Sequence, residues 1–323
     1  MLETAAIIAT CTLVIITLLP ILPSDHWVSR VWEFPRIQIA CLAVLSAILS
    51  FFVTPTNLLI TLVVINLAVV FYHAWWIFPY TIFFPKQVPK SENDQNTCSI
   101  KIMTSNVLMP NHSAEKLVNL ITQYQPDVVV TLETDLWWQE ALELIHPDYP
   151  YRVNRALDNL YGMHLYSKYP LQDVIVKDVI EKNVPSIHCY LLVEEGVKIK
   201  CHFLHPAPPS PTENECSTPR DHELLLIAKE VQDRTGPTIV TGDLNDVAWS
   251  PTTRAFRRIS GLKDPRIGRG MFNTFHAKYA FMRWPLDHIF HSEHFELGKL
   301  QRLPSIDSDH FPLLSHLVYR DKQ

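Results

Sequence analysis

Three uncharged apolar segments precede residue 80, and they constrain the chain more than any other feature. They occupy residues 5–22, 37–53 and 58–78 and contain no Asp, Glu, Lys or Arg. A helix that crosses a hydrocarbon layer ~30 Å thick needs about 20 apolar residues. The first and third segments meet this length, and the second is slightly short. We therefore predict a multi-pass membrane protein with three transmembrane helices.

The flanks of these segments support the same interpretation. The connection at residues 54–57 is too short for anything but a tight helical hairpin. Trp75, Trp76 and Tyr80 close the third segment as an interfacial aromatic belt. A cleavable signal peptide is the alternative for the first segment. Against it, the only charged side chain there is Glu3, and no small-residue cleavage site follows before the next apolar segment.

The orientation of the spans rests on few charges. Three spans place the loop at 24–36 and everything after residue 80 on one side of the membrane. That side carries four basic residues near the spans, Arg30, Arg36, Lys86 and Lys90. The other side carries none. The positive-inside rule favours the cytoplasm for the C-terminal region, with the opposite side as the alternative.

Composition limits what the remaining chain can be. We predict a membrane domain at 1–82, a polar linker at 83–97 and a globular domain at 98–323. The chain is 47% hydrophobic and 19% charged, which excludes intrinsic disorder. Its 28 Lys and Arg against 33 Asp and Glu exclude a charge-driven nucleic-acid binder. Its six Cys are too few for a disulfide-built domain.

Short apolar runs alternate with helical patterns from residue 98 onward. We expect helices at residues 113–124, 136–145, 220–232 and 252–259. We expect strands at residues 99–105, 126–132, 163–166, 174–179, 187–193, 197–204, 238–241, 286–291 and 313–318. Many strands with helices between and outside them predict an α/β domain in which sheets pack together under helical layers.

Polar residues stand at the ends of several predicted strands. Asp243 and Asn245 lie two positions apart, so on extended chain they point the same way. Gly242 would let a substrate approach the backbone. A carboxylate beside an amide can orient a water molecule and donate a hydrogen bond to an oxyanion. A simple turn is the alternative.

The other polar positions also have two interpretations. Glu133 directly follows an apolar run and is either a metal ligand or the start of the next helix. His205 lies in a Pro-rich stretch, where an exposed rigid loop is the alternative. Asp309 and His310 can converge in a turn, and Asp287 is a candidate to set the tautomer of the imidazole. A surface loop is the alternative for His310.

Two further loops are candidates for the substrate wall. Residues 159–164 precede a predicted strand, and residues 273–276 with Trp284 precede the strand that begins near Asp287. A turn and ordinary packing are the respective alternatives. Trp137 and Trp138 are interpreted as packing residues on a helix.

The order and type of these residues resemble the endonuclease/exonuclease/phosphatase superfamily, which shares the DNase I-like fold. The resemblance extends from about residue 98 to 318. Its motifs are SNV at 105–107, LE at 132–133, LHPAPP at 204–209, GDLN at 242–245, PLDHIF at 285–290 and SDHFPL at 308–313.

This resemblance implies a four-layered α/β sandwich of two mixed β-sheets flanked by helices, here preceded by three transmembrane helices. It also implies hydrolysis of a phosphoester by water with Mg²⁺ or Mn²⁺. The implied metal site contains Asn106, Glu133 and Asp309, and the implied catalytic residues are His205, Asp243, Asn245, Asp287 and His310.

The resemblance also assigns roles within this set. Asp243 would orient or deprotonate the attacking water. Asn245 and His205 would stabilise the phosphorane, and His310, held by Asp287, would complete the acid–base set. Several nucleases of the superfamily carry a further acid where this chain has Leu108, so a second metal position is in doubt.

The expected function is that of a membrane-anchored, metal-dependent phosphoesterase acting on a phosphodiester. Its expected partners are a phosphoester substrate and the lipid bilayer, with no obligate protein partner. One alternative is a phosphatase or phospholipase C-like enzyme acting on phospholipid or inositol phosphate, because anchoring brings the site close to headgroups. Another is a non-catalytic membrane-tethered binding protein.

Overall fold

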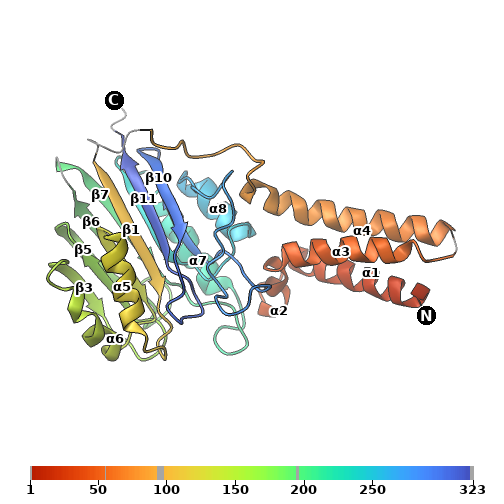
Figure 1. Ribbon diagram of the computed structural model, residues 1–323, viewed down its shortest axis with the longest axis horizontal. Coiled ribbons are helices and arrows are strands. Elements are labelled where there is room, and N and C mark those ends of the chain that lie inside the picture. The colour runs from red at the N-terminus through yellow and green to blue at the C-terminus, as the bar shows by residue number, and fades with distance from the viewer. Residues whose placement is uncertain (1, 55, 93–97, 194–195, 321–323) are drawn as a thin grey trace.

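The computed structural model describes residues 2–54, 56–92, 98–193 and 196–320. It contains an elongated bundle of three long helices and a layered α/β body, with the N-terminus at the far end of the bundle (Figure 1). The bundle consists of α1 (Leu2–Leu18), α3 (Arg36–Ser50) and α4 (Thr56–Ile77). Short turns of 3-10 helix extend α1 through Leu19–Ile21 and α4 through Phe78–Tyr80.

The first and third predicted spans form helices that are long and apolar enough to cross a membrane, Leu2–Ile21 and Thr56–Tyr80. The second forms α3, whose 15 residues fall short of the ~20 that a span needs. It reaches that length only together with Trp27–Glu33, to which it is joined at a bend of 75°. That preceding segment contains α2 (Trp27–Arg30) and the 3-10 turn Val31–Glu33. The described residues thus contain two helices long and apolar enough to cross a membrane, or three if the bent pair is one span.

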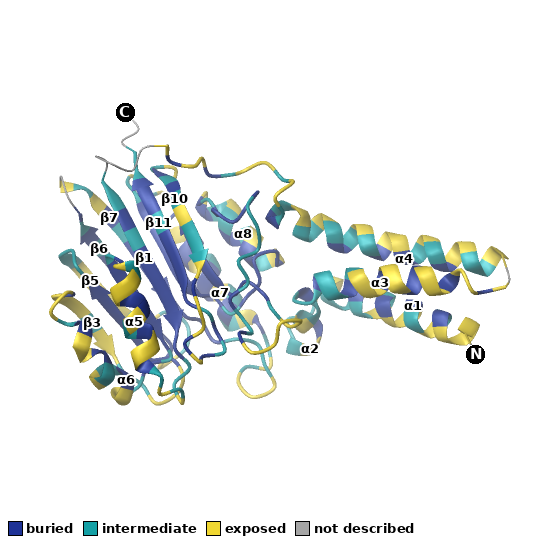
Figure 2. Cartoon of the chain, in the orientation of Figure 1, coloured by how far each residue is buried: buried dark blue, intermediate teal, exposed yellow. Residues whose placement is uncertain are grey.

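Buried residues lie along the helices of the bundle (Figure 2). They include polar as well as apolar side chains, whereas many large apolar side chains of the bundle are exposed. The Asn66 amide donates to Thr10 Oγ1 at 2.8 Å, and Thr10 contacts Ser46 Oγ at 3.1 Å, which joins all three helices. Thr17 Oγ1 and His73 Nε2 lie 3.0 Å apart nearer the α/β body. Side-chain hydrogen bonds between helices are a normal way to join them in lipid, where apolar burial drives association little.

Two mixed sheets form the α/β body. The first has the order β10-β11-β1-β2-β4-β3 and the second the order β5-β6-β7-β8-β9. The pairs β1–β2 and β7–β8 are parallel, and the other neighbours are antiparallel. The strands are β1 (Ser99–Asn106), β2 (Val128–Leu132), β3 (Tyr151–Arg155), β4 (Met163–Ser167), β5 (Leu171–Asp178), β6 (Pro185–Leu192), β7 (Lys198–Leu204), β8 (Thr238–Asp243), β9 (Asp287–His291), β10 (Phe295–Arg302) and β11 (Leu313–Tyr319).

Alternating side chains make four layers from these sheets. Ile100 and Ile102 of β1 pack against the second sheet, whereas Met103 packs against a helix on the outer face. The outer helices of the first sheet are α5 (Ala114–Tyr124) and α6 (Leu136–Ala141), which leads into the 3-10 turn Leu142–Ile145. Those of the second sheet are α7 (Thr218–Glu230) and α8 (Pro251–Ser260). The expected DNase I-like sandwich is confirmed.

The patterns did not predict β3 and β10, which are the two edge strands of the first sheet. All but the central residue of β3 are exposed, and β10 contains Gly298 and a bulge. An edge strand has one neighbour and little apolar alternation, so sequence periodicity detects it poorly.

Two segments attach the bundle to the sandwich. Within the expected linker, residues 93–97 lie outside the described residues, but Val88 is fully buried and residue 91 donates its amide to Leu297 O of β10 at 2.9 Å. In the segment 24–36, the Trp27 amide donates to Glu215 O at 2.8 Å. Trp249 Nε1 donates to Glu33 O, also at 2.8 Å. The bundle is therefore packed onto the sandwich beside the loops that follow β7 and β8.

Candidate active site

The predicted site residues meet at one edge of the sandwich. The carboxyl ends of β1, β2, β7 and β8 supply Asn106, Glu133, His205 and Asp243, and the start of antiparallel β9 supplies Asp287. Just below this edge, Thr104 Oγ1 of β1 and Thr241 Oγ1 of β8 lie 2.9 Å apart. This contact joins the two sheets two residues before Asn106 and Asp243, so both sheets contribute to one site.

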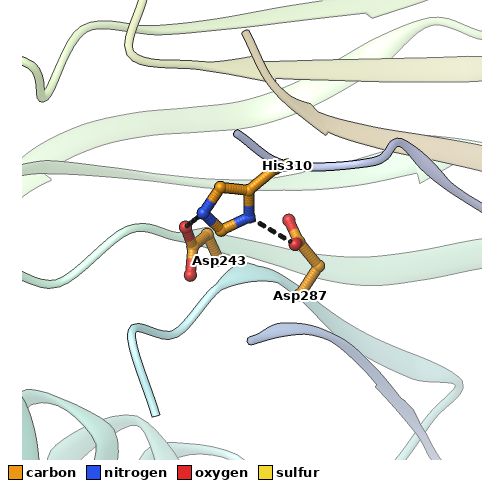
Figure 3. Close-up of side chains that lie close together, drawn as sticks. All are labelled: Asp243, Asp287 and His310. Carbon is orange, nitrogen blue, oxygen red and sulfur yellow. Dashed lines mark hydrogen bonds and ion pairs between the residues drawn. The ribbon is translucent and has the colours of Figure 1, made fainter. Parts of the chain in front are cut away.

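His310 lies between two carboxylates from neighbouring strands of the second sheet (Figure 3). Its Nδ1 donates to Asp287 Oδ2 at 2.8 Å, and its Nε2 lies 3.4 Å from Asp243 Oδ2. All three side chains are buried. Ser308 orients the turn that carries the imidazole, since its hydroxyl donates to Asn106 O at 2.9 Å and accepts from the His310 amide at 3.1 Å.

The electrostatics of this trio favour an ion pair. Burial alone would lower the pKa of His310, but Asp243 and Asp287 raise it to about 10. Burial favours a neutral Asp243, yet the adjacent His310 holds the pKa of this carboxyl below its usual value. At neutral pH His310 is therefore a cation and Asp243 an anion. The surface-loop interpretation of His310 is wrong.

A second pair lies on the first sheet. The Asn106 amide donates to Glu133 Oε1 at 2.7 Å and to Asp243 Oδ2 at 3.2 Å. Glu133 has a φ of 59°, in the left-handed region, which turns its side chain away from the direction of β2. The next helix begins later, with Asp135 as its N-cap accepting from the Trp138 amide. The helix-start role belongs to Asp135, and Glu133 is free for the site.

Glu133 has the properties of a metal ligand. Burial raises the pKa of Glu133 to about 7, although the Asn106 hydrogen bond favours its ionised form. Among the described residues its Oε2 is buried without a hydrogen-bond partner. A carboxylate with such a buried oxygen suits a divalent cation, since Mg²⁺ prefers oxygen ligands and favours the ionised form. Asp309 is half-buried and is close enough to raise the Glu133 pKa further. Both side chains line one cleft, which is described below.

Another group of three also presents ligand atoms close together. Asp243, Asp287 and His310 offer atoms within 4.8 Å of one another. The imidazole, however, already donates Nδ1 to Asp287 and holds Nε2 close to Asp243. A charged imidazole is no metal ligand. The ligand atoms of this trio are thus already engaged with one another, whereas Glu133 Oε2 has no hydrogen-bond partner among the described residues.

His205 and Asn245 complete the predicted set. His205 is buried rather than in an exposed loop, and its Nε2 lies 3.9 Å from Asp243 Oδ2. Burial lowers the pKa of His205 to about 4, so its ring is neutral. The Asn245 backbone amide donates to Asp243 Oδ1 at 2.9 Å, and its side-chain amide donates to Pro206 O at 3.0 Å. The structure thus brings every predicted site residue to the same edge.

The prediction that Gly242 lets a substrate approach the backbone is wrong. A Cβ at this position would lie 1.9 Å from Leu204 O of the neighbouring strand β7. Its φ of 150° also disfavours other residues. Gly242 therefore permits close approach of β7, and so brings His205 and Asp243 together, rather than making room for substrate.

A cleft of about 480 Å³ opens over this site. Both loops considered as substrate walls line it, through Leu160, Tyr161, Phe275 and Trp284. Leu108 lines it as well, at the position where a second metal ligand was in doubt. Trp138 is buried in the core, as expected, whereas Trp137 is 37% exposed and its ring centroid lies 4.2 Å from that of His112.

Sequence reasoning missed two contributors to this site. The first is the segment 24–36, from which Trp27, Arg30, Val31 and Phe34 line the cleft. The second is the buried Arg220, which donates to Asn245 O at 2.7 Å and lies 3.5 Å from Asp246 Oδ1. A second Asp directly after the GDLN motif was the one available signal for a buried cationic partner.

A match to a family model identifies the family of this chain. A model of the endonuclease/exonuclease/phosphatase family matches residues 103–310, a range that contains the whole set from Asn106 to His310. The chain belongs to this family. Members of the endonuclease/exonuclease/phosphatase family are hydrolases of phosphoester bonds, and this chain is accordingly a phosphoesterase. A comparison with curated protein sequences finds no match.

Solved structures of this family are similar to the chain in fold. One from Bacteroides vulgatus is 17% identical, with a TM-score of 0.56, 69% of this chain covered and 99% of the other. The human nocturnin catalytic domain with bound sulfate is 18% identical, with a TM-score of 0.57 and coverages of 69% and 94%. D. rerio TDP2 complexed with single-strand DNA product is 15% identical, with a TM-score of 0.57 and coverages of 68% and 98%. Each alignment covers about the length of the sandwich.

Proposed function

We propose that this chain is a membrane-anchored, divalent-metal-dependent phosphodiesterase that uses water as its nucleophile. The observation that carries the proposal is the charged His310 held between Asp243 and Asp287, next to the Asn106–Glu133 pair. His310 and Glu133 line the cleft, and Asp243 lies directly behind them, 3.4 Å from His310 Nε2.

The chain's own groups account for the proton movements. Asp243 is ionised and accepts a proton from water as the water oxygen bonds to phosphorus. The bond between phosphorus and the leaving oxygen breaks, and that oxygen takes a proton from His310 Nε2. Asp243 Oδ2 lies 3.4 Å from the same Nε2, so the proton it received can return to the imidazole. Asp287 holds the ring through Nδ1 during this cycle.

His205 and Asn245 face the developing charge. His205 lines the cleft, where the N–H of its neutral imidazole can donate to a phosphoryl oxygen. Asn245 uses one amide hydrogen on Pro206 O, and its other hydrogen remains for the phosphorane. Arg220 holds the Asn245 backbone in place. Preorganised donors of this kind stabilise charge that appears in the transition state.

Glu133, Asn106 and Asp309 would hold the metal. A divalent ion bound there neutralises charge on the phosphoryl group and the leaving oxygen. Glu133 supplies its vacant Oε2, and Asn106 keeps Glu133 in place through Oε1. Leu108 stands where a further acid could bind a second ion, so this chain offers a single metal position, which magnesium or manganese would occupy.

Turnover of bis-p-nitrophenyl phosphate by the purified full chain tests this proposal. We expect p-nitrophenol release with Mg²⁺ or Mn²⁺, loss of release with EDTA, and recovery when metal is restored. Asp243→Asn should lose at least ~100-fold in kcat, because it removes the base. Asp233→Asn, an exposed carboxylate away from the site, is the matched control. Full activity in EDTA would refute the metal, and an active Asp243→Asn would refute the base.

We further propose that α1 and α4 anchor the enzyme in a membrane, with the sandwich on the cytoplasmic side. The full chain should stay in the bilayer fraction after alkaline carbonate washing. An alkaline phosphatase reporter fused after residue 323 should be inactive in cells, because that enzyme needs an oxidising compartment. An active reporter would place the sandwich on the opposite side.

A further inference from the structure

An apolar cleft lies beside the active-site cleft, between the segment 24–36 and the loop before β9. Its volume is about 390 Å³, and its principal lining residues are Val31, Trp32, Phe34, Phe281, Met282 and Trp284. Four of these six, Val31, Phe34, Met282 and Trp284, also line the active-site cleft. The two clefts therefore adjoin along shared walls. Both volumes fall in the ~300–1,000 Å³ range typical of small-molecule sites.

The apolar cleft opens at the base of the helix bundle. Gln38, in the first turn of α3, lines it and donates its amide to Phe281 O at 2.7 Å, so the loop is tied to a bundle helix. The loop between α8 and β9 reaches the base of the bundle beside α2 (Figure 1). Phe281 is 71% exposed, and Val31 and Met282 are more than 40% exposed. Such exposed apolar side chains next to membrane helices are stable in contact with acyl chains.

The opposite end of the joined clefts is polar. His310, Asp309 and Glu133 line the active-site cleft, and Arg30 forms part of its wall. Arg30 pairs with Glu33 at 2.9 Å, which keeps the guanidinium at the membrane-proximal side of the site. The joined clefts therefore extend from the active-site residues around His310, past Arg30, to an apolar opening at the base of the bundle.

We propose that the substrate is a membrane lipid phosphoester, whose phosphorus lies at His310 and one of whose hydrocarbon chains lies in the apolar cleft. This inference rests on the proposed function and names its substrate class. A lipid in the bilayer reaches the site from the base of the bundle without leaving the membrane. A nucleic acid carries no long hydrocarbon chain to fill such a cleft.

A chain-length series on one leaving group tests the substrate class. The probes are methyl, octyl and hexadecyl 4-nitrophenyl phosphate, assayed on the full chain in maltoside micelles at fixed detergent. We expect octyl to exceed methyl in kcat/KM by about tenfold or more, since even one methylene in an apolar pocket is worth ~10-fold or more. Equal kcat/KM along the series would overturn the lipid substrate while leaving the phosphodiesterase intact. Hydrolysis of none of the probes would instead refute the proposed function.

Variants of Phe281 distinguish binding of the hydrocarbon chain in the apolar cleft from simple partition of the probes into micelles. Phe281→Asp places a charge in the apolar cleft and should reduce the octyl-to-methyl ratio by about tenfold. Phe281→Ala should reduce it less, and it guards against misfolding by the charged variant. Leu144→Asp, an equally exposed apolar residue on the far side of the sandwich, should keep the wild-type ratio. A ratio unchanged in both Phe281 variants, or preferred cleavage of plasmid DNA over octyl 4-nitrophenyl phosphate, would overturn the proposal.

Discussion

The helix bundle exposes large apolar side chains and buries polar ones to a degree that the central strands of the β-sandwich do not. In the bundle, Asn66 and His73 are almost fully buried, whereas Phe71 between them in sequence is 72% exposed. In the sandwich, Val130 and Ile239 are fully buried between the sheets. A difference of this kind is expected of helices that lie in lipid, because water drives apolar groups inward and lipid does not.

The same comparison shows what buried polar groups do in each region. In the bundle they bond one helix to the next, as Asn66 does with Thr10. In the sandwich, polar groups gather at the edge where the strands carry Asn106, Asp243 and His310, and there they serve chemistry. Glu223 is a buried carboxylate of the sandwich outside that edge. The comparison therefore predicts different consequences when polar groups of each kind are replaced.

The largest expected effect is at His310. His310→Ala should lower kcat by ~10²–10⁴-fold, because it removes an acid–base group. Asp287→Asn should cost less, because the ring remains. The double variant should be no worse than His310→Ala, since residues that act as one unit are not additive. The measurement is kcat of all four proteins on bis-p-nitrophenyl phosphate. Multiplicative losses would show that the two side chains act separately.

Glu223 on α7 tests whether a buried polar group away from the site is a cost to stability. It is 3% exposed, and burial, with repulsion from Glu181, raises its pKa from 4.5 to about 7. The folded state then holds the proton more tightly than the unfolded state. The stability that this proton contributes is full below pH 4.5 and is lost as pH rises through about 7.

Glu223→Gln should therefore stabilise the protein by about 2–3 kcal/mol at pH 8 and by much less at pH 5. Chemical unfolding at the two pH values measures the difference. Glu140→Gln, an exposed residue, is the matched control and should change neither value. Equal effects at both pH values would mean that Glu223 is ionised in the folded protein, and that the sandwich tolerates a buried charge outside its active edge.

Glu133 tests the chemical role of the vacant carboxylate oxygen. Glu133→Gln should raise the metal concentration for half-maximal activity by ~10–100-fold, the range seen when even a supporting group of a metal site is lost. The melting temperature should not fall, because burial makes the ionised carboxylate costly without metal. A titration with Mg²⁺ on both proteins gives the shift. An unchanged titration would place the metal elsewhere in the cleft.

The smallest expected effect is in the bundle. Asn66→Leu removes the hydrogen bond to Thr10 and also removes Asn66 Oδ1, which is buried without a partner among the described residues. Interhelical hydrogen bonds in membranes average ~0.6 kcal/mol, so the loss of stability should be of that order. Unfolding in mixed micelles measures it. A loss of several kcal/mol would mean that this polar cluster, rather than apolar packing, holds the three helices together.

Central strands and the identity of the site residues followed from the sequence. Strands β2 and β8 begin with β-branched runs, and an acid directly follows β2 and ends β8, so both the strand and its acid are local signals. The edge strands β3 and β10 lack such signals. The sequence also did not predict the role of Gly242 in strand packing or the burial of His205, because both depend on how closely β7 and β8 approach.

By itself, the sequence determined the apolar helices that could cross a membrane, the α/β class and a set of candidate residues for phosphoester hydrolysis, since these depend on side-chain type and short-range period. Only the tertiary structure decided that His310 lies between Asp243 and Asp287, and that Val31 and Met282 line one cleft. These contacts join residues far apart in the chain. They are set by the packing of two sheets and a bundle, a long-range property that no local pattern encodes.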